Sequence, residues 1–152
     1  MHDESLIRVL HVISNMSREG AQTFIMNVYR NLDKSNVQFD FLVNTQEKCA
    51  YDDEIISMGG KIIYVPPPDK KNILNYTNKL SRIMVNNGPY KCVHSHSMYF
   101  NGIVTQAAYR ADIPIRISHA HNISDGRSNS IYRSIYRNIM RKKILKYSTN
   151  LF

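Results

Sequence analysis

Short apolar runs rich in β-branched residues alternate with segments of helical spacing along the whole chain. The runs predict strands at residues 6–13, 37–43, 61–65, 90–93 and 113–117, with a further strand beginning within 148–152. The intervening segments predict helices at residues 21–32, 52–58, 73–85, 98–110 and 130–146. Crossovers through helices make the strands parallel. The sequence therefore predicts an α/β fold with a Rossmann-like, doubly wound and mostly parallel sheet.

The 152 residues are enough for one domain with a hydrophobic core but not for two. We therefore expect residues 1–152 to form a single domain. No stretch is apolar enough to span a membrane, and the polar residues 1–5 do not form a signal peptide. Cys49 and Cys92 are far apart and belong to no metal-binding pattern, so a reducing cytoplasm is the expected location.

Two His-x-His sequences follow predicted strands. The first contains His94 and His96, and the second contains His119 and His121. Because the carboxyl ends of parallel strands meet at one edge, where open α/β sheets bind their ligands, we expect these four histidines to gather there. Residues two apart on a strand share a face, so His94 and His96 can both point toward a cleft. A structural role, with the rings bonded to loops, is the competing interpretation for His94.

The same four imidazoles suggest an alternative, a small zinc hydrolase in which the metal activates water. A hydrolytic site usually needs a carboxylate as a ligand or base. Asp125 is the only acid near these sequences. The preferred prediction is therefore a site without a metal or other cofactor.

A polar loop joins the first strand to the first helix and ends at Gly20. Free backbone amides and the helix dipole favour an anion at such a junction. A tight turn that needs glycine for its backbone angles is an equally good interpretation. In the helix that follows, Phe24, Val28 and Leu32 share one face, joined by Ile25 and Tyr29.

The net charge is +8, and residues 127–146 contain seven basic and no acidic side chains. Arg133, Arg137 and Arg141 form a basic flank on the helix expected there, and isoleucines 131, 135 and 139 form another stripe. We favour a surface helix that packs these isoleucines on the sheet, although the basic flank also suits an anionic membrane. Nucleic acid is not an expected partner, because the chain contains no known recognition module.

With these residues placed, the sequence resembles the N-terminal half of GT-B glycosyltransferases, specifically the GT4-like enzymes of capsule and exopolysaccharide synthesis. The resemblance extends along nearly the whole chain. It rests on residues 8–13 with 20–22, 26–30 with 37–43, 93–97, and 113–122. Their order and spacing together make the likeness specific. Where the family often has a second glycine after Gly20, this chain has Ala21.

The resemblance implies retaining transfer of a sugar, as by a hexosyltransferase, from a nucleotide-sugar donor to a glycan or lipid-linked acceptor. It places Gly20, Ala21 and Gln22 near the donor phosphates. It also implies a catalytic histidine beside the donor sugar, a position that His119 and His121 straddle. The remaining substrate-binding candidates are His94, His96 and Asn122.

In the family, a second domain binds the nucleotide and carries a pair of glutamates. This chain ends where the link to that C-terminal domain is expected, so we expect the donor-binding domain to be absent from it. We expect either a fragment or a chain completed by a partner subunit, inactive alone, in the cytoplasm and peripheral at the inner face of the cell membrane. The alternative is a non-catalytic acceptor- or membrane-binding module.

Overall fold

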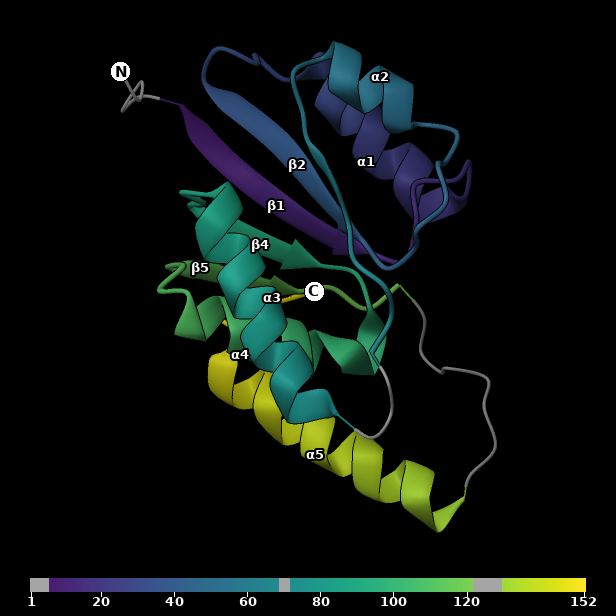
Figure 1. The fold of residues 1–152 in the computed structure, drawn as a ribbon, viewed down its shortest axis with the longest axis vertical. Helices are drawn as coiled ribbons and strands as arrows, with labels where there is room; N and C mark the ends of the chain where they lie inside the picture. The colour runs from purple at the N-terminus through teal and green to yellow at the C-terminus, as the bar shows by residue number, and fades with distance from the viewer. Residues whose placement is uncertain (1–5, 69–71, 122–129) are drawn as a thin grey trace.

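The computed structural model describes residues 6–68, 72–121 and 130–152. Six strands in these residues form one sheet in the order β3-β2-β1-β4-β5-β6, with every neighbouring pair parallel (Figure 1). The strands are β1 (Ile7–Ile13), β2 (Val37–Val43), β3 (Ile62–Tyr64), β4 (Cys92–Ser95), β5 (Ile115–Ser118) and β6 (Asn150–Leu151). The helices are α1 (Gly20–Asn31), α2 (Asp52–Ser57), α3 (Ile73–Asn87), the 3-10 turn η1 (Met98–Phe100), α4 (Asn101–Arg110) and α5 (Ile131–Tyr147). The predicted Rossmann-like parallel fold is confirmed.

The direction of strand order reverses between β1 and β4. The chain adds β2 and β3 on one side of β1, then crosses and adds β4, β5 and β6 on the other. Such a switch point leaves a crevice outside the carboxyl ends of the two central strands. β1 and β4 pair with His11 opposite His94, so β4 extends past the predicted 90–93 and includes the first histidine of its pair.

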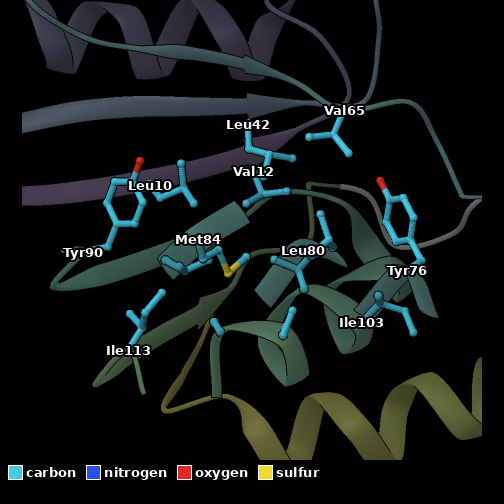
Figure 2. Packing of buried hydrophobic residues seen from close by; sticks show 14 of the residues in the cluster. Leu10, Val12, Leu42, Val65, Tyr76, Leu80, Met84, Tyr90, Ile103 and Ile113 are labelled. Atoms are coloured by element: carbon cyan, nitrogen blue, oxygen red, sulfur yellow. The ribbon is translucent and has the colours of Figure 1, made fainter. Parts of the chain in front are cut away.

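Two hydrophobic clusters hold the helices to the sheet. Helices α1 and α2 lie on one side of it, and α3, α4 and α5 lie on the other (Figure 1). Strand β2 serves both layers, because Phe41 joins the cluster under α1 while Leu42 joins the opposite cluster. Figure 2 shows the second cluster, in which strand residues such as Val12 face helix residues such as Leu80. Each fully buried side chain of this kind contributes roughly 1.5–3 kcal/mol.

The apolar residues predicted to share one face of α1 divide between solvent and core. Phe24 is 63% exposed and Val28 is also exposed, whereas Ile25, Met26 and Tyr29 are buried. Of the residues named from the sequence, Ile25 and Tyr29 lie in the buried core, and Leu32 packs at its margin. The apolar residues of α1 occur on more than one side of the helix, so their spacing alone is compatible with two different buried faces. The buried stripe is the one that faces Phe39 and Phe41 of β2, since the Tyr29 ring stacks on Phe39.

Helix α5 also presents a different face from the predicted one. Ile131, Ile135 and Ile139 are exposed, and Met140 is the residue of this helix that is buried. The helix packs on α4 rather than placing its isoleucines on the sheet. Gly102 explains the choice, because a Cβ there would lie 2.8 Å from the backbone oxygen of Met140. The glycine lets the two helix backbones approach closely on the Met140 side. None of the described helices combines the length and apolar character needed to cross a bilayer.

Candidate functional site

All five histidines of the described residues gather at the carboxyl ends of β1, β4 and β5. The predicted convergence of His94, His96, His119 and His121 is therefore observed. Ring centroids lie 4.1 Å apart for His94 and His96, and 4.2 Å apart for His119 and His121. His11 of β1 is the fifth member, at 5.4 Å from His96. His11 was not identified from the sequence because it lies within an apolar run. Its position near the carboxyl end of a predicted strand was the signal that could have identified it.

Three imidazole contacts connect these rings. His11 Nδ1 lies 3.1 Å from His96 Nε2, and His96 Nδ1 lies 2.8 Å from His121 Nε2. His94 Nε2 lies 3.3 Å from His119 Nδ1. A neutral imidazole carries one N–H, so its two nitrogens cannot both donate. The two bonds of His96 must therefore run in one direction, either from His11 outward or from His121 inward.

Burial lowers the pKa of four of these imidazoles, those of His11, His94, His96 and His121, and keeps them uncharged near neutral pH. Burial, with a contribution from His94, lowers the pKa of His11 to about 3. Burial and the neighbouring His119 and His121 lower the pKa of His94 to about 4. Burial first, and then neighbouring histidines, lower the pKa of His96 and of His121; the first neighbour is His11 for His96 and His119 for His121. These four rings therefore offer neutral hydrogen-bond donors and acceptors rather than positive charge.

Asn101, the first residue of α4, anchors the loops that carry the histidines. Its Oδ1 accepts hydrogen bonds from Ser95 Oγ at 2.6 Å and from the Ser97 amide at 2.8 Å. Its Nδ2 donates to the backbone oxygen of His119 at 3.2 Å. The side chain is 1% exposed and thus ties the end of β4 to the end of β5. Asn101 was not identified from the sequence, because the apolar pattern places it within the helix expected at residues 98–110 and indicates nothing further about its role.

The loop before α1 keeps its backbone accessible. A Cβ at Gly20 would meet nothing within 4 Å, and Gly20 does not adopt a left-handed backbone conformation. The interpretation that Gly20 is required for its backbone angles is therefore wrong. Glu19 precedes the first residue of α1, and within the described residues its side chain makes no hydrogen bond that caps the helix. Gln22 is buried, and its amide donates to the Asn15 carbonyl at 3.3 Å, so it orders the loop.

The three arginines of α5 do not form one free basic flank. The guanidinium groups of Arg137 and Arg141 lie over the ring of Tyr99, at 5.8 and 5.5 Å from its centroid. Arg133 lies over Tyr136 at 4.9 Å. Arg133 and Arg137 are half-buried, and Arg141 is exposed. Asn122, the remaining predicted site residue, lies outside the described residues.

An apolar hollow of about 200 Å³ opens at the same edge of the sheet, next to the histidines. The ring of Phe152, which lines it, lies 6.0 Å from the ring of His119. Its lining comes from η1, α4, the ends of β5 and β6, and α5. The lining residues are Met98, Tyr99, Asn101, Ser118, Ala120, Ile144, Leu151 and Phe152.

Two groups of three histidines could each hold a metal ion: His11 with His94 and His96, and His96 with His119 and His121. Within the described ranges, no carboxylate or thiolate joins either group. Asp125, the acid considered for a zinc hydrolase, lies outside them. The geometry therefore gives no support to a hydrolytic metal site, which would need a base.

Hydrogen-bonding side chains gathered at the switch point, where open α/β sheets bind their ligands, define a ligand-binding Rossmann-like protein. Residues 18–151 match glycosyltransferase family 4, and the chain belongs to that family. The resemblance to GT4-like enzymes seen in the sequence is thereby confirmed.

Two curated relatives extend this match. The chain is 46% identical over 117 residues, 77% of its length, to "Putative glycosyltransferase EpsF" of Bacillus subtilis (strain 168). It is 26% identical over 147 residues, 97% of its length, to the capsular polysaccharide biosynthesis glycosyltransferase CapH of Staphylococcus aureus. The matched region spans 30% of the first relative and 39% of the second.

Proposed function

We propose that this chain is the acceptor-side, N-terminal domain of a retaining glycosyltransferase. Such an enzyme would move a sugar, a hexose in our proposal, from a nucleotide-sugar to a glycan or lipid-linked acceptor in surface polysaccharide or capsule synthesis. The observation that carries the proposal is the cluster of hydrogen-bonded imidazoles at the carboxyl edge of β1, β4 and β5 in a family 4 chain.

His119 and His121 are the proposed catalytic side chains. They stand at the accessible end of the cluster, where His119 is half-buried and His121 exposed. An uncharged imidazole can accept a hydrogen bond from one hydroxyl of the donor sugar and, through its other nitrogen, remain bonded to a ring deeper in the cluster. The half-buried His94 and the buried His96 supply those inner rings. Fixed hydrogen-bonding partners hold the sugar in a reactive orientation without reorganisation.

The junction before α1 is the proposed contact to the donor phosphates. Negative charge grows on the departing phosphate during glycosyl transfer, and amides at a helix N-terminus stabilise it. The open space at Gly20 allows a phosphate to approach the backbone of Gly20 and Ala21. Gln22 acts there indirectly, by holding the loop.

The apolar hollow beside His119 is the proposed acceptor side. Its lining by Met98, Ile144 and Phe152 suits a lipid-linked acceptor better than a free sugar. The donor nucleotide and the paired glutamates would come from a second domain or a partner subunit, so we expect the chain alone to be inactive. We place the enzyme in the cytoplasm, peripheral at the inner face of the membrane through the exposed side of α5.

The test is turnover of the enzyme that contains both domains, with His119→Ala and His121→Ala made singly and together. We expect turnover to fall by about 100-fold or more in the double variant, in line with loss of positioned hydrogen-bonding groups. Arg82→Ala, at an exposed position of α3, is the control. If the double variant turns over like the control, the histidine assignment is wrong. If the two-domain enzyme transfers no sugar, the binding-module alternative replaces the proposal.

A further inference from the structure

The accessible end of the histidine cluster offers three ring nitrogens to a single ion. The ligand atoms of His96, His119 and His121 lie within 4.8 Å of one another. A tetrahedral zinc ion binds imidazole at about 2.0–2.1 Å, which sets any two ligand nitrogens roughly 3.4 Å apart. Small rotations of these side chains therefore reach zinc geometry.

The other nitrogens of two of these rings are already engaged. His96 faces His121 through Nδ1, while its Nε2 lies 3.1 Å from His11. His119 pairs with His94 through Nδ1, which leaves its Nε2 for an ion. Metal-binding histidines usually donate their second N–H to a fixed acceptor, which sets the tautomer and the ring orientation. His11 and His94 would provide those acceptors.

We propose that His96, His119 and His121 bind a divalent transition-metal ion of the zinc class, with a fourth position open to solvent. Imidazole nitrogen is a preferred ligand of Zn²⁺ and its neighbours in the first transition row. Solvent reaches the site, because His121 is exposed and His119 is half-buried. Binding needs no carboxylate, in contrast to hydrolysis. The proposal stands independently of sugar transfer.

The inner group, His11 with His94 and His96, is the less suitable of the two. His11 is 4% exposed, and its ring centroid lies 4.4 Å from that of Phe39 and 5.4 Å from that of Phe41. An ion there would lose its hydration next to apolar rings without a compensating negative charge. The outer group lets the ion keep water at its open position.

The site overlaps the residues that we assign to the donor sugar. A bound ion would occupy the ring nitrogens of His119 and His121 that sugar hydroxyls would otherwise use. Zinc should therefore compete with the donor and inhibit a complete enzyme. This effect is secondary to binding itself, which the chain can show alone.

The experiment titrates zinc chloride into tag-free, chelator-treated protein and measures heat. His2, which lies outside the described residues, is replaced by glutamine in every sample. We expect one ion per chain, and Co²⁺ in place of zinc should give the absorption bands of a tetrahedral complex. His96→Gln and His121→Gln should each weaken zinc binding by at least about ten-fold. Cys49→Ser, which removes another accessible zinc ligand, should leave binding unchanged.

Circular dichroism checks that the variants fold. If His96→Gln unfolds, His121→Gln decides the question, since its side chain is at the exposed end of the cluster. Absence of saturable binding by the parent protein overturns the proposal. So does binding of equal strength in parent protein and folded His121→Gln, or a loss of binding in Cys49→Ser.

Discussion

Gly102 of α4 lies directly against the backbone of Met140 in α5. A Cβ at Gly102 would stand 2.8 Å from the Met140 oxygen and 3.1 Å from Lys143 Cβ. The contact joins α4 to α5, whose isoleucine-rich outer side faces away from the domain. The contact therefore determines which side of α5 is exposed to solvent.

Replacement of Gly102 by alanine should destabilise the protein despite the higher helix propensity of alanine. Propensity favours alanine by about 1 kcal/mol, but the clash with backbone atoms requires α5 to move, and overpacking costs about 1–3 kcal/mol. Urea unfolding measures the difference. Gly20→Ala is the control, since its added Cβ meets nothing within 4 Å. Equal stability of both variants would contradict the close packing.

Removal of Arg8 should cost about 3–5 kcal/mol in the free energy of unfolding, because it leaves a buried charge unpaired. Asp40 is fully buried and accepts from Arg8 Nε at 3.0 Å and Nη2 at 2.6 Å. Arg8→Met can be compared with Arg30→Met, which breaks the exposed pair with Glu54. Exposed pairs contribute little. Similar losses from both substitutions would show that Asp40 does not depend on Arg8.

Acid should destabilise the fold through His11. Its pKa is about 3 in the folded protein and about 6.5 when unfolded. Below pH 6.5 the unfolded chain binds a proton that the folded protein does not bind until about pH 3. The contribution of His11 to the free energy of unfolding is therefore fully present above pH 6.5. It falls as the pH is lowered toward 3, with a slope approaching about 1.4 kcal/mol per pH unit.

Denaturant unfolding in chelator at pH 7.5 and pH 5 measures this loss. His11→Gln has no titrating ring and should show a shallower dependence on pH. A slope equal to that of the unmodified protein would mean that other groups carry the effect.

Binding to anionic vesicles should depend on lysines of α5. The outer side of this helix exposes apolar residues such as Ile131 and Ile135, and Lys142 and Lys146 are exposed with them. Each cation near an anionic bilayer adds about 1 kcal/mol, so the Lys142→Ser/Lys146→Ser variant should bind roughly 30-fold more weakly. Sedimentation with vesicles that contain phosphatidylserine measures binding.

The control for that experiment replaces Lys48 and Lys61 by serine, which removes two exposed cations outside α5. Equal loss in both double variants would point to net charge alone. Arg137 and Arg141 are less suitable test positions, because both stack on Tyr99 and their removal also changes packing.

The order and type of elements could be predicted from the sequence because apolar periodicity depends on neighbours along the chain. Strand β2 was predicted with its observed bounds, Val37–Val43. The convergence of the His-x-His pairs followed from parallel topology. The buried faces of helices were harder to predict. In α1, Phe24 is apolar but exposed, because the surface against which the helix packs determines which apolar residues are buried.

The rest of the site depended on contacts distant in sequence. His11 joins the cluster through pairing of β1 with β4, and a single sequence does not reveal such register. Asn101 acquires its role from three partners on two strand ends. The face of α5 was mispredicted since nothing local marks Gly102 as a close-approach point.

The one-way chain of bonds through His96 has a consequence for mutagenesis. His11 and His121 both contact His96, through different nitrogens. A substitution at the exposed His121 can reverse the tautomer of His96. That reversal changes the hydrogen bond made by His11, which is 4% exposed. Substitutions at His11 and His121 should therefore be epistatic, and the cost of the pair should differ from the sum of the single costs.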